Sequence, residues 1–317
     1  MKKFSYSNLF LDALNLVLNY KYLWLLGLLA ALSGSEVSNF RNTSDLSLSG
    51  SGSFSYLSNY FSDSARLTSS LGTNGERFLT ATASTLLLGI VLWVVGSIGQ
   101  IALIKAAETL NGNHGMALPE ALRAGIRFLM PVIGIAAVLY GPYYGASILI
   151  GRALASSIAN DLTAFPTVPF VLLLLILFPL GVFVGAVYPL AQRGVVSHGL
   201  GVIPGITAGW RFLWQNLKRL IFIVLILALL LLVYSGIVSA ILLPLAGGTV
   251  FPALFTWLET GSISAGQVLS IAGFSLLGTV LSAPITAYAS VVMTLAYCTL
   301  SEQAQTRLNA KRKHAAA

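Results

Sequence analysis

The sequence predicts an all-α membrane protein with six transmembrane helices, arranged as three hairpin-like repeats that each begin with a cytoplasmic amphipathic helix. Of the 317 residues, 56% are hydrophobic and 9% are charged, whereas a soluble protein carries about 25% charged residues. The few charges border long apolar stretches, and lysine and arginine collect at alternate ends of these stretches. A chain with so little polar surface does not face water on all sides.

Five charge-free stretches predict five of the spans. Each is longer than the about 20 residues that a helix needs to cross the hydrocarbon core. They lie between Arg77 and Lys105, Arg127 and Arg152, Asp161 and Arg193, Arg219 and Glu259, and Glu259 and Glu302. In the fourth stretch, Pro244, Gly247, Gly248 and Pro252 predict one helix followed by a loop.

The first span has two interpretations, because the apolar run between Lys21 and Glu36 is too short to cross a membrane alone. Apolar residues at helical spacing extend it backwards, which favours an amphipathic entry helix leading into a short span over 20–32. The alternative is a secretory signal that ends near Ala31, Leu32 and Ser33. Its charged region would be unusually long and would contain Asp12.

The distribution of basic residues predicts the orientation. With both termini in the cytoplasm, 14 of the 18 lysines and arginines lie inside, and Arg41, Arg66, Arg77 and Arg152 lie outside. Positive residues near span ends favour the cytoplasmic side. We therefore expect a multi-pass membrane protein with both termini in the cytoplasm. The same placement beside apolar runs explains the net charge of +8 without a nucleic-acid partner.

Three amphipathic lead-in helices, at 7–19, 118–128 and 203–215, predict an internal repeat. Each precedes a shorter span, and three longer spans over 78–110, 165–196 and 268–302 complete the units. The units are 1–111, 112–199 and 200–317, within a single membrane domain. The connection over 33–78 holds 14 serines and five glycines. Disorder is the simpler expectation for it, and a ligand-contacting cap with a short surface helix is the alternative.

Polar residues at span depth form the first candidate site. Gln100, Lys105 and Glu108 belong to the second span, and Gln192 and Arg193 end the fourth. Lys105 and Glu108 have the spacing of a helical ion pair, and Pro179 and Pro284 are expected to break the long helices. Together the five polar residues could line a cytoplasm-facing cavity. The alternative is interface anchoring with basic side chains that reach the headgroups.

Basic and aromatic residues on or beside two lead-in helices form the second candidate site. They suit contact with anionic headgroups. The residues are Arg123, Arg127, Arg211, Lys218, Arg219, Trp210 and Trp214. Membrane lipids are therefore the expected partners, and a protein partner is possible but unidentified. The pairs Gly141/Gly145 and Gly181/Gly185 suggest close helix approach, through a motif that is common in apolar sequence.

Residues for catalysis are scarce in this chain. The three histidines, His114, His198 and His314, fall outside the predicted spans, and the sequence has no zinc-binding His-Glu-x-x-His pair. Ser147 and Ser275 lie in or near spans without a base at their depth, and the single cysteine, Cys298, is expected to be a packed residue. We expect no catalytic residues, metal site or cofactor.

Two segments resemble a known group of proteins. The segments over 19–27 (NYKYLWLLG) and 210–216 (WRFLWQN) are similar to those of uncharacterised bacterial six-span membrane proteins. The six-span region of those proteins is similar to the membrane domain fused to some glycerophosphodiester phosphodiesterases. The resemblance implies the six-span fold, but the catalytic barrel of those enzymes is absent here, so no activity carries over. Mitochondrial carriers are also basic and built from three repeats. The segment of this chain that begins at Pro189 lacks the acidic residue of their Pro-x-acid-x-x-base signature, so the chain does not fit that family.

We therefore expect a non-enzymatic accessory protein or lipid-interacting scaffold of a bacterial cytoplasmic membrane. The second hypothesis is a transporter of a small or lipidic solute, with its site between repeats near Gln100, Lys105, Gln192 and Arg193. The absence of a carboxylate deep in a span argues against the usual proton coupling. An intramembrane serine enzyme that uses Ser275 is a third hypothesis.

Overall fold

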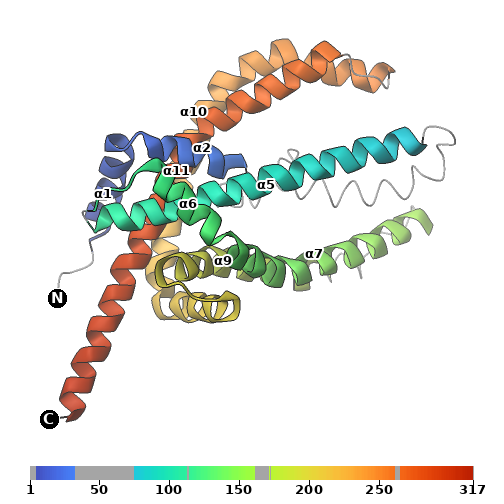
Figure 1. Cartoon of the computed structure of the whole chain (residues 1–317). Coiled ribbons are helices and arrows are strands. Elements are labelled where there is room, and N and C mark those ends of the chain that lie inside the picture. The colour runs from blue at the N-terminus through green and yellow to red at the C-terminus, as the bar shows by residue number, and fades with distance from the viewer. Residues whose placement is uncertain are drawn as a thin grey trace.

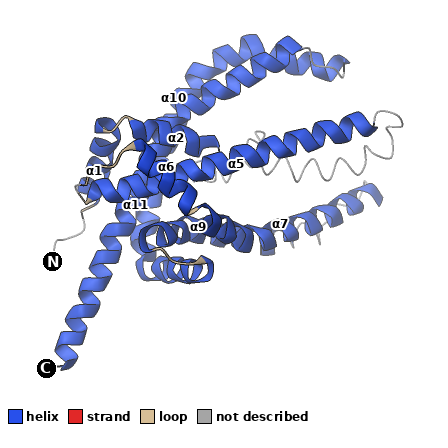
Figure 2. Cartoon of the chain, in the orientation of Figure 1, coloured by secondary structure: helices blue, strands red, loops and turns tan. Residues whose placement is uncertain are grey.

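The computed structural model describes residues 5–32, 75–112, 114–160, 171, 173–260 and 265–316, and the regular structure in these ranges is helical (Figure 2). Most of the predicted external connection, 33–74, lies outside the described residues. The all-α prediction is confirmed for the described part of the chain. Among the described residues, five helices are long and apolar enough to span a membrane, and the number is six if a bent helix pair forms one span. The protein is therefore an integral, multi-pass membrane protein.

Helices α1 (Tyr6–Asn19) and α2 (Tyr22–Leu32) form the bent pair, with an angle of 101° between them. Leu9, Ala13 and Val17 recur at helical spacing and form the buried face of α1. At the bend, Trp24 Nε1 donates a hydrogen bond to the Val17 carbonyl at 2.8 Å. The predicted amphipathic entry helix and short apolar helix are both present.

Helices α5 (Gly75–Asn111), α6 (Leu118–Arg127) and α7 (Leu129–Asn160) follow. Two features stabilise the start of α6. A proline lies in its first turn, and the Glu120 carboxylate accepts a hydrogen bond from the Ala117 N–H at 3.3 Å. The helix ends at Phe128, whose backbone (φ −94°, ψ 4°) leaves the helical region, and α7 starts at the next residue. A second amphipathic helix therefore leads directly into a span.

The last elements are the π-helical turn η1 (Leu173–Leu177) and helices α9 (Phe178–His198), α10 (Val202–Thr260) and α11 (Ala265–Ala316). Gly199 ends α9 in the left-handed conformation, with φ of 64°. Asn216 interrupts α10 with φ of −123° and ψ of 18°. The interruption separates an amphipathic first part, which ends at Gln215 as the sequence predicts, from the apolar remainder.

Two sequence expectations about helix ends are wrong. Helix α10 continues through Pro244, Gly247 and Gly248 to Thr260, and α11 continues through Pro284. Peptide groups in an apolar setting have no water to replace a lost helical hydrogen bond, so proline and glycine end helices less readily there. The expected contrast of shorter and longer spans fails in the third unit, because the part of α10 after Asn216 continues to Thr260.

The helices form a packed hub from which apolar arms extend (Figure 1). The hub contains α1, α2, α6, α9 and parts of α5, α7, α10 and α11. The other parts of α5, α7 and the α10–α11 pair extend from it to one side. Burial follows this division. In the most apolar stretch of Gly89–Asn111, 56% of the residues are buried, whereas in the most apolar stretch of Val202–Gly248 only 11% are buried. The exposed apolar arms suit lipid contact, and the hub holds the polar residues.

Close helix contacts in the hub depend on glycine. A Cβ on Gly27 of α2 would lie 2.5 Å from the Ala283 carbonyl oxygen of α11, and one on Gly125 of α6 would lie 2.6 Å from the Ile98 carbonyl oxygen of α5. A Cβ on Gly209 of α10 would lie 2.8 Å from the Ala191 nitrogen of α9. Backbones this close leave no room for a side chain.

The glycine pairs that the sequence suggested are not the ones that approach a neighbouring helix. A Cβ added to Gly141, Gly145 or Gly185 would have no neighbouring atom within 4 Å, and one on Gly181 would face only the ring of Tyr143, at 3.2 Å. Gly141 and Gly145 belong to α7, and Gly181 and Gly185 belong to α9. The spacing motif alone therefore does not identify the packed face.

Candidate functional site

A polar contact joins three helices at the centre of the hub. Gln100 of α5 donates from Nε2 to Ser290 Oγ of α11 at 3.3 Å, and Arg193 of α9 donates from Nη2 to the Ser290 carbonyl at 3.3 Å. Thr294 Oγ1 donates to the same carbonyl at 2.7 Å. Ser290 is thus the residue at which polar groups from α5, α9 and α11 converge.

Arg193 is fully buried, with 0% of its surface exposed. A buried cation is costly unless hydrogen bonds replace its water, and this guanidinium also donates from Nη1 to the Pro189 carbonyl at 2.8 Å. Gln100 is 4% exposed, and its Oε1 accepts no hydrogen bond from the described residues. The centre therefore combines a cation held by backbone carbonyl groups with one unused buried acceptor.

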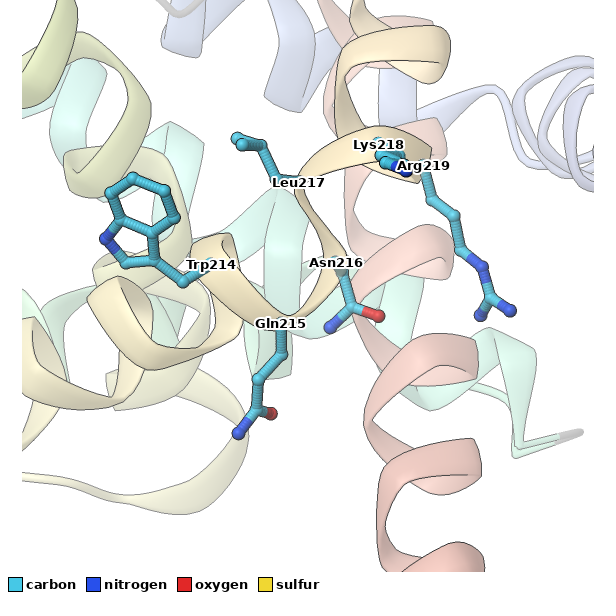
Figure 3. Close-up of a pocket in the computed structure, with 6 residues that line it drawn as sticks. All are labelled: Trp214, Gln215, Asn216, Leu217, Lys218 and Arg219. Carbon is cyan, nitrogen blue, oxygen red and sulfur yellow. The ribbon is translucent and has the colours of Figure 1, made fainter.

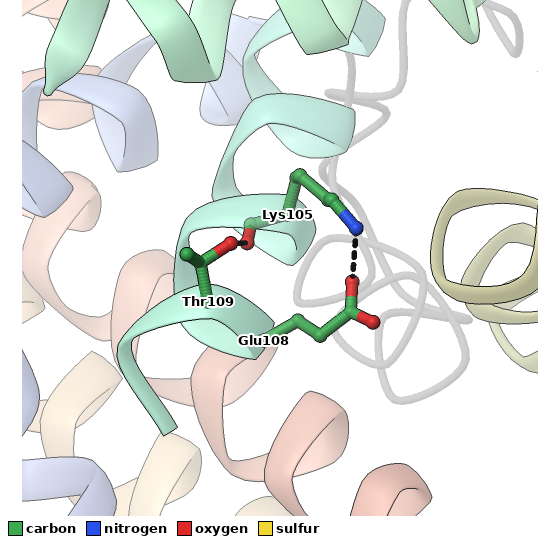
Figure 4. A network of polar contacts seen from close by, with 3 residues as sticks. All are labelled: Lys105, Glu108 and Thr109. Carbon is green, nitrogen blue, oxygen red and sulfur yellow. Dashed lines mark hydrogen bonds and ion pairs between the residues drawn. The ribbon is translucent and has the colours of Figure 1, made fainter. Parts of the chain in front are cut away.

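Lys105 and Glu108 form an ion pair on α5 near this centre (Figure 4). Lys105 Nζ lies 2.9 Å from Glu108 Oε2, as the i, i+3 spacing predicts, and Thr109 Oγ1 donates to the Lys105 carbonyl at 2.8 Å. Their side chains keep 30% and 25% exposure. Glu108, Arg193 and Lys105 all act electrostatically on Cys298 of α11, so the three charges belong to the same part of the hub.

Gln192 belongs to a separate contact, although it precedes Arg193. Its Nε2 donates to Tyr188 Oη at 2.7 Å, and the Tyr188 ring packs edge-on against Tyr140 of α7, with centroids 5.0 Å apart. Gln192 is 2% exposed, and its Oε1 has no hydrogen-bond partner among the described residues. The structure thus gathers Gln100, Lys105, Glu108 and Arg193 around α11, and directs Gln192 toward Tyr188.

The second candidate site lies on the outside of the hub. Arg123 and Arg127 are exposed on α6, and the Arg127 guanidinium lies 5.7 Å from the centroid of the Phe128 ring. Arg211 is exposed on the first part of α10, between Trp210 and Trp214, which are 38% and 59% exposed. The two indole rings meet edge-to-face, with centroids 5.2 Å apart. Cationic and aromatic side chains therefore share the outer surface of both helices.

A pocket of about 400 Å³ opens at the interruption of α10 (Figure 3). Its lining runs from Trp214 to Arg219. Asn216 Nδ2 donates to the Phe212 carbonyl at 3.2 Å, and Arg219 Nη1 donates to Gln303 Oε1 of α11 at 3.0 Å. Arg219 therefore links α10 to α11, whereas Lys218 is exposed. Of the two, Lys218 is the side chain available to a ligand.

The residues considered for catalysis lie on α7 and α11. Ser147 Oγ donates to the Tyr143 carbonyl of its own helix at 2.8 Å, and Ser275 is exposed on the α11 arm. Cys298 is half-buried. Among the described residues, no group of three or more His, Cys, Asp or Glu side chains could hold a metal ion.

Sequence reasoning missed two features of these sites. Ser290 and Thr294 gave no signal, because small hydroxyl residues in a span usually bond to their own helix. Tyr20, Lys21 and Trp24 could have been found, because the five residues from Tyr20 to Trp24 match the segments that begin at Ile126 and Trp210. In each segment, a bulky residue is followed by a basic residue, an aromatic residue, a leucine and a second bulky residue.

Comparison with known proteins identifies no relative. No family model, curated protein or solved structure matches the chain. The resemblance to bacterial six-span proteins, which rests on 19–27 and 210–216, therefore stays a prediction, and the chain's function is argued from its own residues.

Proposed function

We propose that this chain is a non-enzymatic protein of a bacterial cytoplasmic membrane that binds anionic lipids and acts as an accessory or scaffold protein. The observation that carries the proposal is the outer surface of α6 and of the first part of α10. Arg123, Arg127, Arg211 and Lys218 are exposed there beside Trp210 and Trp214. Indole rings favour the membrane interface, and basic side chains are attracted to anionic headgroups.

The helix packing supports an arrangement of three hairpin-like repeats. Helix α1 packs on α11, α6 packs on α5, and α10 packs on α9. Gly125 and Gly209 make the last two contacts at backbone distance. In the second and third units the amphipathic helix thus rests on the helix that precedes it, whereas α1 rests on α11, the last helix. We propose that both termini lie on the cytoplasmic side.

The experiment that tests lipid binding compares the full chain in discs of phosphatidylcholine with discs that also contain phosphatidylglycerol. We expect extraction into mild detergent to leave phosphatidylglycerol bound in preference to phosphatidylcholine, as counted by native mass spectrometry. Neutralising Arg123, Arg127, Arg211 and Lys218 to glutamine should weaken the preference. Equal retention of the two lipids by the wild-type chain would contradict the proposal.

The same preparation tests the scaffold role. A scaffold should be purified from native membranes together with a protein partner in fixed stoichiometry, and quantitative mass spectrometry of the purified complex would measure it. A chain that reproducibly purifies alone, with lipid only, would remove the scaffold part of the proposal and leave lipid binding.

A transporter of a small or lipidic solute is the second candidate, because Gln100, Ser290 and Arg193 form a buried polar contact between three helices. Buried polar groups within spans often mark a solute path. The double variant Gln100→Leu with Gln192→Leu should abolish transport and leave a scaffold working. Full transport in that variant would exclude the site as described.

A further inference from the structure

Three five-residue segments of this chain have the same residue pattern and the same pattern of exposure. The segments, named anchors here, are Tyr20 to Trp24, Ile126 to Met130, and Trp210 to Trp214, with sequences YKYLW, IRFLM and WRFLW. Each has a bulky apolar or aromatic residue, a basic residue, an aromatic residue, leucine, and then tryptophan or methionine. The recurrence puts one anchor in each proposed repeat.

The structure exposes the first, second and fifth positions of each anchor. The first-position residues Tyr20, Ile126 and Trp210 are 39%, 62% and 38% exposed. The fifth-position residues Trp24, Met130 and Trp214 are 41%, 75% and 59% exposed, and the basic residues between them, Lys21, Arg127 and Arg211, are all exposed.

The third and fourth positions of the anchors are turned toward the protein. Leu23 is fully buried and Phe212 is 8% exposed, and the remaining members of these two positions are half-buried. The covered pair holds each anchor on the hub, so the three exposed side chains are presented in a fixed direction. The same division of roles at three separate places indicates a shared surface function.

The anchors lie where amphipathic helices meet spans. The first is at the 101° bend between α1 and α2, and the second contains Phe128, where α6 gives way to α7. The third ends two residues before the interruption at Asn216. Such junctions lie at headgroup depth when the second helix crosses the membrane. Local contacts fix the junctions, as the Trp24 hydrogen bond to the Val17 carbonyl shows.

We propose that each anchor binds one anionic phospholipid, with the basic side chain on the headgroup phosphate and the two bulky side chains against the upper acyl chains. Charge complementarity selects the anionic lipid, because each exposed cation lies between apolar groups that favour the interface. The proposal rests on the lipid-binding function above and adds its sites and its stoichiometry. It includes Lys21, which the two basic helices alone do not suggest.

Native mass spectrometry of the full chain, extracted from discs containing phosphatidylcholine and phosphatidylglycerol, tests the three sites. We expect three retained phosphatidylglycerol molecules on the wild-type chain. Each of Lys21→Gln, Arg127→Gln and Arg211→Gln should lower the number by one, and the triple variant should retain none. An unchanged apparent Tm in detergent confirms that each variant is folded.

The matched control removes equal charge elsewhere, with Lys311→Gln, Arg312→Gln and Lys313→Gln combined. It should retain three lipids, and a loss equal to that of the anchor variant would overturn the proposal. Loss with Arg123→Gln plus Lys218→Gln, but with none of the anchor variants, would also overturn it while leaving the proposed function intact. If the wild-type chain showed no preference for phosphatidylglycerol, the anchor proposal and the proposed lipid-binding function would both be wrong.

Discussion

Gln100 of α5 and Ser290 of α11 are 190 residues apart in sequence, yet the Gln100 amide donates to the Ser290 hydroxyl at 3.3 Å in the buried hub. The bond joins helices from different predicted repeats. It differs from the other serine contacts of α11, such as that of Ser270 with the Gly266 carbonyl, which stay within one turn. The contact therefore contributes to tertiary structure, and its loss should affect stability.

We expect Ser290→Ala to destabilise the protein by about 0.5–1.5 kcal/mol, because it leaves the buried Gln100 amide without this acceptor. Unfolding in a detergent mixture, followed by far-UV circular dichroism, measures the change. Ser270→Ala, which removes an exposed hydroxyl from the same helix, is the control and should be neutral. Equal stability of the two variants would show that the hub does not depend on this bond.

The contact between α10 and α9 makes a second prediction. A Cβ on Gly209 would lie 2.8 Å from the Ala191 nitrogen, and a backbone atom cannot rotate away as a side chain can. We expect Gly209→Ala to destabilise by about 1–3 kcal/mol through overpacking. Gly145→Ala is the matched control, because no atom lies within 4 Å of its Cβ position. Helix propensity alone would make both substitutions favourable, so a loss confined to Gly209 identifies the packing contact.

The sequence was sufficient for the features that depend on local pattern. Hydropathy located the candidate spans. The 3.6-residue period located amphipathic helices that end at Asn19 and Gln215 as expected, and at Arg127, one residue before the expected end at Phe128. It failed where the outcome depends on a distant neighbour. The pair Gly141 and Gly145 has the same four-residue spacing as Gly205 and Gly209, but only the latter meets α9. The partner of Gln100 could not be inferred either, because Ser290 looks like any other serine in a span.

The bend between α1 and α2 supplies a third prediction. Trp24 Nε1 donates across it to the Val17 carbonyl at 2.8 Å, and phenylalanine keeps an aromatic ring but has no N–H. We expect Trp24→Phe to cost about 0.5–1.5 kcal/mol. Trp214→Phe, at 59% exposure, should cost less. Hydrogen exchange over α1 should rise in the Trp24 variant alone, and unchanged exchange there would show that the bend is held by packing.

The proposed orientation gives a fourth prediction. With both termini in the cytoplasm, a fluorescent protein fused after Ala317 should mature and fluoresce, whereas a periplasmic reporter enzyme at the same place should be inactive. The reporter enzyme inserted in the 33–74 connection should be active, because the proposed orientation puts that connection outside. The positive-inside distribution is the physical basis. The reverse pattern of reporters would invert the topology and put the anchors on the other leaflet.

The Lys105–Glu108 pair tests how strongly the hub excludes water. The two charges are 2.9 Å apart with side chains 30% and 25% exposed, so solvent should screen them as it does other helical i, i+3 pairs. A double-mutant cycle with Lys105→Gln and Glu108→Gln should give a coupling of about 0.3–0.5 kcal/mol that falls as salt rises. A coupling several-fold larger and insensitive to salt would mean that this end of α5 is shielded from water, which would strengthen the case for an enclosed polar site beside Arg193.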